Sequence, residues 1–326
     1  MSKIIDIQRR GGVHQGKKLF DVNWMLHNRC TYDCSYCPSA NKSGTDSWLR
    51  LDNVKAFCND LDNYRKQSDP GSEVEVIFNG GEPTVWKDFV PLVDYCNTLG
   101  WHVVVNTNAS RSLRWWEENV EKFSWLILSY HTETVNDDEF IEKVKLCEKY
   151  VKTSVNIMLN PNKDYFNKAV EFSKRLQSET NDVNIQHHRI QYNFGLQNID
   201  VPRYTTYQNF KIRNLKDRYP DTTKRNYKTV WQDYVGKWDN GHQEVIRGND
   251  LIQKRQINFN GWTCFQGREG LFIDALGDVN IGACRVGGTL GNILKPQEIK
   301  WPTGPVTCPI SSCTCVTDIL KTKHRP

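Results

Sequence analysis

Residues 28–37 read Asn28-Arg29-Cys30-Thr31-Tyr32-Asp33-Cys34-Ser35-Tyr36-Cys37 and place three thiols within eight positions. Three residues separate the first two thiols, and two residues separate the second from the third. A closed iron-sulfur cube is held by four thiolates, so this triplet predicts a 4Fe-4S cluster with one iron open to a small molecule. A partial zinc knuckle and unrelated buried thiols are the alternatives, although zinc sites favour paired Cys-x-x-Cys units.

A second motif, Gly80-Gly81-Glu82-Pro83, follows further along the chain. Two glycines let a backbone approach a ligand closely, and a carboxylate beside them can accept hydrogen bonds from a cation. Taken together, Cys-x3-Cys-x-aromatic-Cys and Gly-Gly-Glu-Pro resemble the motifs of the radical S-adenosylmethionine (SAM) superfamily.

The resemblance implies a role for each motif. In that family the cysteine loop holds the 4Fe-4S cluster, and the free iron chelates the amino and carboxylate groups of SAM. By this pattern the cluster ligands are Cys30, Cys34 and Cys37. Tyr36 is expected beside the adenine, and Gly80, Gly81 and Glu82 are expected to meet the methionyl ammonium.

Between residues 18 and 195, short apolar or β-branched runs alternate with amphipathic segments, which predicts repeated βα units and a parallel sheet. Six strands are expected, at 19–26, 73–78, 102–106, 125–129, 154–159 and 183–191. Helices are expected at 51–67, 86–99, 113–123, 137–150 and 165–178. The fold class is therefore α/β, and the resemblance implies a partial (β/α)6 TIM-like barrel.

Three segments are predicted along the chain. Residues 1–195 form the barrel, residues 196–260 form a basic, aromatic linker or insertion, and residues 261–326 form a small domain with a β-hairpin and an auxiliary cluster.

Parallel α/β folds place their chemistry at the carboxyl ends of the strands. In the radical SAM family these positions hold the ribose and carboxylate of SAM, so the resemblance makes Asn106, Ser129 and Asn156 candidate SAM contacts. Ordinary strand-end hydrogen bonding is the alternative for each. On the last strand, His187 and His188 must face opposite sides of the sheet, and the sequence does not decide which one faces the barrel.

The last fifth of the chain contains a second group of thiols. Residues 264–284 begin and end with cysteine and predict a hairpin of strands 271–275 and 279–281. Four places on a second 4Fe-4S cluster could be filled from five thiols, so one is spare. These thiols are Cys264, Cys284, Cys308, Cys313 and Cys315.

This pattern, with Gly-Asn-Ile at 291–293, resembles the SPASM/Twitch extension of some radical SAM enzymes. The tail spacing Cys-x4-Cys-x-Cys departs from the full SPASM pattern, which favours the shorter Twitch type with one auxiliary cluster. A zinc ribbon is the alternative.

The chain has 11 cysteines, and residues 1–18 lack the apolar core of a signal peptide. No apolar run is long enough to span a bilayer, so we expect a cytoplasmic protein with no membrane partner. Many thiols in a long chain without a signal indicate metal ligation in a reducing compartment rather than disulfides. Cys58, Cys96 and Cys147 lie in expected amphipathic helices and should pack in the core.

The net charge of +5 is concentrated in residues 200–255, which contain 12 Lys and Arg against seven Asp and Glu, interleaved with aromatic residues. Such a stretch can bind nucleic acid. A solvated insertion with a small aromatic core is the more frequent explanation of this composition.

The resemblance implies reductive cleavage of SAM to a 5′-deoxyadenosyl radical, with electrons from a donor such as flavodoxin or ferredoxin, and abstraction of a substrate hydrogen. An auxiliary cluster could accept an electron from the substrate, which fits a net oxidation, and oxidation or cross-linking of a peptide is the leading expectation. Dehydrogenation of a sugar or aminocyclitol, modification of a nucleotide or nucleic acid, and a non-catalytic iron-sulfur or zinc scaffold are the alternatives. The sequence does not set the substrate, the hydrogen donor or general base, or the oligomeric state.

Overall fold

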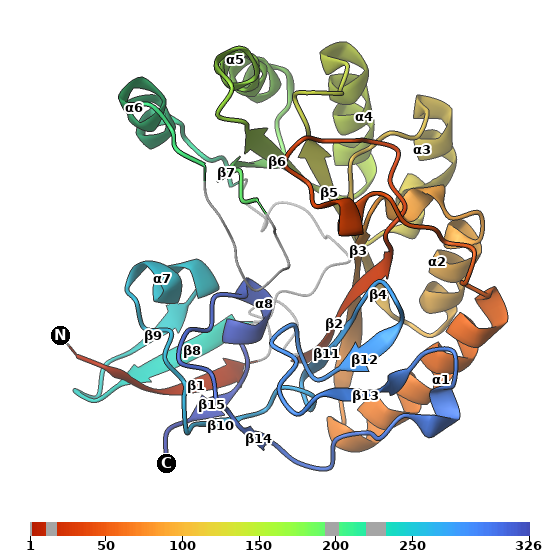
Figure 1. Ribbon diagram of the computed structural model, residues 1–326, viewed down its shortest axis with the longest axis vertical. Helices are drawn as coiled ribbons and strands as arrows, with labels where there is room; N and C mark the ends of the chain where they lie inside the picture. The colour runs from red at the N-terminus through yellow and green to blue at the C-terminus, as the bar shows by residue number, and fades with distance from the viewer. Residues whose placement is uncertain (1, 11–17, 193–201, 220–232) are drawn as a thin grey trace.

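The computed structural model describes residues 2–10, 18–192, 202–219 and 233–326 (Figure 1). Its larger sheet has nine strands in the order β13-β12-β11-β2-β3-β4-β5-β6-β7. The six strands expected from the sequence are confirmed as parallel neighbours in chain order. They are β2 (Lys18–His27), β3 (Ser72–Gly80), β4 (His102–Thr107), β5 (Trp125–Tyr130), β6 (Lys152–Leu159) and β7 (Val183–Arg189).

Helices connect these strands and surround the outer side of the curved sheet (Figure 1). Ser112, Asn136 and Asn162 cap three of them by accepting backbone N–H groups of the first turn. Among the described residues, no helix is long and apolar enough to cross a membrane. The connecting helices are α1 (Leu51–Ser68), α2 (Phe89–Thr98), α3 (Leu113–Asn119), α4 (Asp137–Tyr150) and α5 (Lys163–Glu179), and α6 (Thr206–Asn214) follows β7.

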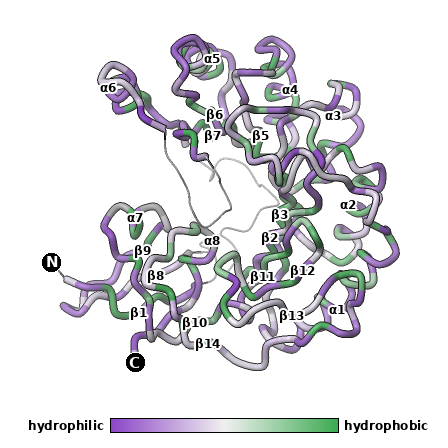
Figure 2. The backbone as a smooth tube through the Cα atoms, in the orientation of Figure 1, coloured by the Kyte–Doolittle hydropathy of each residue, from purple (hydrophilic) through white to green (hydrophobic). Residues whose placement is uncertain are grey.

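The main core lies between the parallel strands and these helices. Alternate residues of β2, such as Val22 and Trp24, are fully buried in it, because successive side chains of a strand point to opposite faces. Cys58, Cys96 and Cys147 are fully buried in the same core, which confirms their predicted packing role. Figure 2 shows the hydrophobic residues gathered on the strands, while the outer helix turns are hydrophilic.

A second sheet of six strands has the order β14-β10-β15-β1-β8-β9. Its apolar face forms a separate core that includes Ile7, Trp238 and Phe259. The N-terminal strand pairs on one side with β8 and on the other with the last strand of the chain. The elements of this part are β1 (Ile4–Arg10), β8 (Asp233–Trp238), β9 (Gln243–Ile246), α7 (Gly248–Gln253), β10 (Thr263–Cys264), β14 (Val306–Thr307), α8 (Val316–Ile319) and β15 (Lys323–His324).

The C-terminal strands β11 (Gly270–Ile273), β12 (Asp278–Asn280) and β13 (Thr289–Asn292) extend the larger sheet. β11 and β12 pair antiparallel, and β11 also lies parallel to β2. The larger sheet is therefore mixed. The division of the chain at residues 195 and 260 stays a prediction, and strand pairs connect all three of its segments.

Candidate functional site

The cysteine loop leaves the carboxyl end of β2 and lies directly against the end of β3. The Gly81 N–H donates to the His27 carbonyl (2.8 Å), and the Glu82 N–H donates to the Arg29 carbonyl (2.7 Å). A Cβ at Gly80 would lie 2.2 Å from the His27 oxygen, and one at Gly81 would lie 2.0 Å from the Arg29 oxygen. Gly80 also has a φ of 137°, which favours glycine. Both positions need glycine because two backbone segments meet there.

The Glu82 carboxylate is fully buried beneath this loop and accepts four hydrogen bonds. Oε1 accepts from the Thr84 N–H (3.1 Å), the Thr84 hydroxyl (2.7 Å) and the Thr107 hydroxyl (2.7 Å), and Oε2 accepts from the Asn108 N–H (2.7 Å). Burial raises the pKa of Glu82, and these donors act in the opposite direction. Because the Asn108 amide lies 3.7 Å from the Cys30 sulfur, Glu82 links the ends of β3 and β4 to the thiols. That this segment also meets the SAM ammonium stays a prediction.

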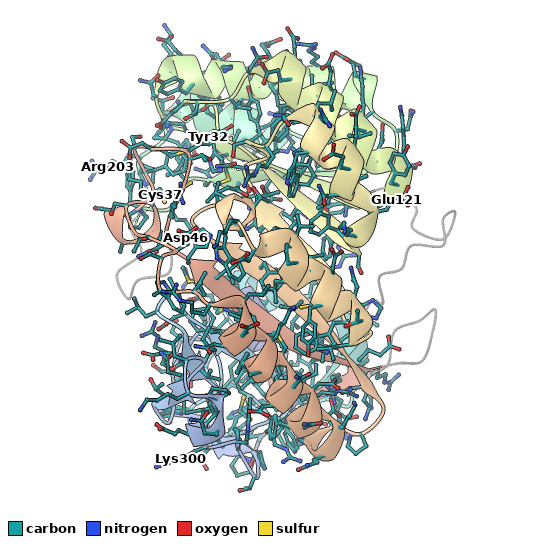
Figure 3. The ribbon with its side chains drawn as sticks, turned by 90° about the vertical axis from the view of Figure 1, so that its right-hand side faces the viewer. Tyr32, Cys37, Asp46, Glu121, Arg203 and Lys300 are labelled. Atoms are coloured by element: carbon teal, nitrogen blue, oxygen red, sulfur yellow. The ribbon has the colours of Figure 1, made fainter. Side chains whose placement is uncertain are left out.

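The three thiols lie at the carboxyl end of the sheet. Figure 3 shows Tyr32 and Cys37 at one side of the molecule and Glu121, which precedes β5, at the other. Cys34 is buried, while Cys30 and Cys37 are half-buried. Burial raises the pKa of each thiol, that of Cys34 to about 12. The charge of Glu82 adds to the rise in the pKa of Cys30, and neighbouring thiols add to the rise for Cys34 and Cys37.

The donor set of this loop consists of three thiols, which are the usual ligands of iron-sulfur clusters. Three thiols from one loop fit three corners of a 4Fe-4S cluster and leave the fourth iron open. Bound iron would stabilise the thiolates that burial otherwise disfavours.

Tyr36, expected beside the adenine, is buried between the second and third thiols. Its ring stacks on His131, with centroids 6.0 Å apart, and its hydroxyl lies 2.5 Å from His131 Nδ1. Contact with an adenine stays a prediction, but the Tyr36 ring is held at the carboxyl end of the sheet.

A row of polar side chains crosses the strands at the same end of the sheet. The Asn79 amide donates to Asn23 (2.9 Å), the Asn106 amide donates to Asn79 (3.2 Å), and the Ser129 hydroxyl donates to Asn106 (3.0 Å). Asn156 is paired with Ser129 in the strand register and is half-buried. The structure therefore brings the three predicted SAM contacts onto adjacent strands, and their role stays a prediction.

The structure decides the orientation of β7. His187 lies against α5, where its Nε2 is 2.7 Å from the Ser173 hydroxyl, and its Nδ1 is 2.8 Å from Asp217. By alternation, Gln186 and His188 face the opposite side, together with the polar row. The His188 Nε2 atom is buried and has no hydrogen-bond partner among the described residues, and burial lowers the pKa of His188.

Two polar residues near the site were not singled out from the sequence. Asn79 directly precedes the two glycines, and Glu133 follows β5 by three residues and contacts the cysteine loop. Both lie at carboxyl ends of strands, so strand-end position was the signal that could have identified them.

The thiols of the tail also come together. Cys264, Cys308 and Cys313 are buried in one cluster of the second core. The N–H of Cys284 donates to the Asp318 carboxylate (2.9 Å). Burial raises the pKa of the Cys284 thiol to about 12, and the nearby Asp318, Cys264 and Cys308 add to the rise. Four predicted ligands therefore lie in or beside the second core.

A buried cation lies beside these thiols. Lys323 is 1% exposed, and its ammonium donates to the carbonyls of Asp318 (2.6 Å) and Ile319 (3.0 Å). Its charge counteracts the rise in the pKa of Cys264 and Cys313. Cys315 is half-buried at the start of α8. The tail thus offers thiols and a compensating positive charge, which suits an anionic group.

Parts of the chain are similar to a known protein family and to known proteins. Residues 24–173 match the family model of the radical SAM superfamily. The chain is 32% identical over 110 residues to Fe-coproporphyrin III synthase of Methanosarcina barkeri, covering 33% of this chain and 25% of that protein. It is 35% identical over 89 residues to 7,8-dihydro-6-hydroxymethylpterin dimethyltransferase of Methanocaldococcus jannaschii, covering 27% of this chain and 17% of that protein. The matches thus span a quarter or less of these two relatives.

A solved structure shares the fold over more of the chain. SuiB of Streptococcus suis, bound to precursor peptide SuiA, aligns with a TM-score of 0.51 at 14% identity, covering 88% of this chain and 65% of that one. The matched family region contains the cysteine loop, the glycine pair and Glu82, which the structure joins by hydrogen bonds. The part of the chain that matches the radical SAM superfamily, residues 24–173, is therefore the part that contains the candidate site.

Proposed function

We propose that the protein is a radical SAM enzyme that abstracts a hydrogen atom from a peptide and leads to its net oxidation or cross-linking. The proposal rests on one observation. The thiol loop is hydrogen-bonded to Gly81 and Glu82, and this contact lies beside the polar row at the carboxyl end of the sheet. When bound and reduced by a donor such as flavodoxin or ferredoxin, the 4Fe-4S cluster and SAM supply a 5′-deoxyadenosyl radical.

The chain's own residues bind and orient these groups. Cys30, Cys34 and Cys37 hold three irons, and Tyr36 contacts the adenine. The polar row, with Asn106, Ser129 and Asn156, holds the ribose and carboxylate of SAM. These side chains lie in fixed positions because the strands and the hydrogen bonds between neighbours restrain them, which is the preorganisation that such chemistry needs.

The tail supplies a second, auxiliary 4Fe-4S cluster of the Twitch type in this proposal. Its ligands are Cys264, Cys284, Cys308 and Cys313. Three of these thiols are buried in the second core, and the N–H of the fourth residue, Cys284, donates to the Asp318 carboxylate. Cys315, half-buried at the start of α8, is the spare thiol. This group would accept an electron from the substrate, which fits a net oxidation.

The peptide class is preferred over the other substrates for two reasons. SuiB, which has a similar fold, was solved with a precursor peptide. The side of the sheet that faces the site also offers an uncharged amide, Gln186, which can pair with peptide groups. Mass spectrometry of cell extracts with and without the gene tests this choice. Loss of two hydrogens from a peptide supports it, and the same loss from a sugar or aminocyclitol overturns it.

The decisive experiment is anaerobic purification with iron and sulfide counts, followed by incubation with SAM and dithionite. About eight irons per chain and formation of 5′-deoxyadenosine are expected. Zinc in place of iron, or iron without SAM cleavage, would overturn the enzymatic function in favour of a scaffold.

Cys284→Ala is expected to lower the iron content from about eight to about four per chain while SAM cleavage continues. The reason is that Cys284 lies in the tail group, away from the loop that is proposed to bind SAM. Iron analysis and 5′-deoxyadenosine formation measure the two effects. The matched control, Cys315→Ala, should retain about eight irons. Loss of four irons in the control would reassign the spare thiol.

A further inference from the structure

The segment that follows β5 contacts the cysteine loop at two consecutive residues. Glu133 Oε2 accepts a hydrogen bond from the Ser35 N–H (2.8 Å), and Oε1 accepts one from the Ser35 hydroxyl (2.7 Å). Two residues earlier, His131 contacts Tyr36 through ring stacking and through the tyrosine hydroxyl. Ser35 and Tyr36 are the residues between the second and third thiols. The segment after β5 therefore contacts the loop between two proposed ligands.

A third segment fixes Glu133 itself. The Asn160 amide, which follows β6, donates to Glu133 Oε1 (2.5 Å). Asn160 is buried, and its own oxygen accepts the Asn162 N–H (2.9 Å) at the start of α5. The Glu133 carboxylate therefore connects the cysteine loop to the ends of both β5 and β6.

The contact between Tyr36 and His131 has two parts. The two rings stack, and the tyrosine hydroxyl lies 2.5 Å from His131 Nδ1. Together these contacts restrain the ring that lies between the second and third thiols in sequence.

The Glu133 carboxylate accepts three hydrogen bonds from two segments, namely from the Ser35 N–H, the Ser35 hydroxyl and the Asn160 amide. Hydrogen bonds to a charged acceptor are stronger than neutral ones. The carboxylate is therefore suited to holding the loop in place.

We propose that Glu133 and His131 are positioning residues that hold residues 34–37 in the conformation that receives the cluster. The inference rests on the proposed function, since it concerns the loop that binds the iron. We call the contacts of Glu133 and His131 with Ser35 and Tyr36 the clamp. Without the clamp, the loop would have to become ordered when the metal binds, at a cost in conformational entropy. Cluster retention should therefore depend on two residues that do not contact iron.

Glu133→Gln tests the clamp. All three donors point at the carboxylate, so a glutamine must turn its NH2 group toward at least one of them. With reconstituted protein, we expect iron release to a chelator to accelerate at least about tenfold, and the change in the cluster's EPR spectrum on adding SAM to weaken. Thermal unfolding of the same variant shows whether the fold is intact.

Three further variants make the test specific. Glu139→Gln removes an exposed carboxylate from the first turn of α4 and should leave iron release unchanged. Adding Asn160→Asp to Glu133→Gln places a carboxylate opposite the new NH2 group and should slow the release again. His131→Phe keeps an aromatic ring but loses the hydrogen bond, and should weaken the SAM-induced spectral change more than it lowers the iron content.

The outcomes separate the clamp from the function. If the wild-type protein binds no iron, both the proposed function and the clamp are wrong. If the wild-type protein binds iron and Glu133→Gln releases it at the wild-type rate with a normal response to SAM, the clamp is wrong and the function stands.

Discussion

Replacing Cys34 by alanine is expected to abolish 5′-deoxyadenosine formation and to lower the iron content from about eight to about four per chain. Cys34 is the most buried of the three thiols, at 4% exposure, and it is the middle one in sequence. Two remaining thiols cannot hold a cluster that already lacks a fourth protein ligand. Iron analysis, EPR of the reduced protein and chromatography of the SAM cleavage products measure the effect.

Cys147→Ala is the matched control for this substitution. Its thiol is fully buried in α4, far in sequence from both cysteine groups, so iron and SAM cleavage should be retained. The expected cost is about 1 kcal/mol of stability from the small cavity. Retention of SAM cleavage by Cys34→Ala would contradict the cluster assignment.

The parallel part of the fold could be predicted because its signals are local. The strands β2 to β7 were expected from short apolar or β-branched runs, and each of the first five is followed by a segment with helical periodicity. Asn136 and Asn162 mark helix starts through capping, which is also a local property. Sequence order and strand order coincide here, so no long-range information was needed.

The second sheet could not be predicted, because its pairings join distant parts of the chain. β1 pairs with β8 and β15, so Ile7 lies opposite both Gly236 and Lys323. The tail hairpin was predicted from its turn, but the parallel pairing of β11 with β2 was not. Such pairings depend on which edges are left open once the other strands have formed.

The candidate site, too, could be predicted only where its signals are local in sequence. The spacing of the three thiols is a local pattern, and it identified the loop. The contact of Glu133 with Ser35 spans 98 positions, and nothing near either residue in sequence indicates it. Burial of Glu82 was also not predicted, since a carboxylate beside two glycines suggested a ligand contact rather than four hydrogen bonds within the protein.

Glu82→Ala is expected to destabilise the metal-free protein by about 4 kcal/mol or more, because the substitution leaves four buried donors without an acceptor. Each orphaned donor costs about 1–3 kcal/mol, and the contributions are not additive because the donors share one carboxylate. Denaturant unfolding followed by circular dichroism measures the loss.

Glu82→Gln is the matched variant, since it keeps the shape of the side chain. Its carbonyl oxygen can still serve the three donors at the Oε1 position, but its NH2 group then faces the Asn108 N–H. The loss of stability should be smaller, about 1–3 kcal/mol. Asn108 should nevertheless be displaced, and with it the contact to the Cys30 sulfur, so iron uptake should fall even where the fold survives. A loss below about 1 kcal/mol for Glu82→Ala would mean that the thiol loop does not depend on this carboxylate. In that case Glu82 would be available to the SAM ammonium, as the family resemblance implies.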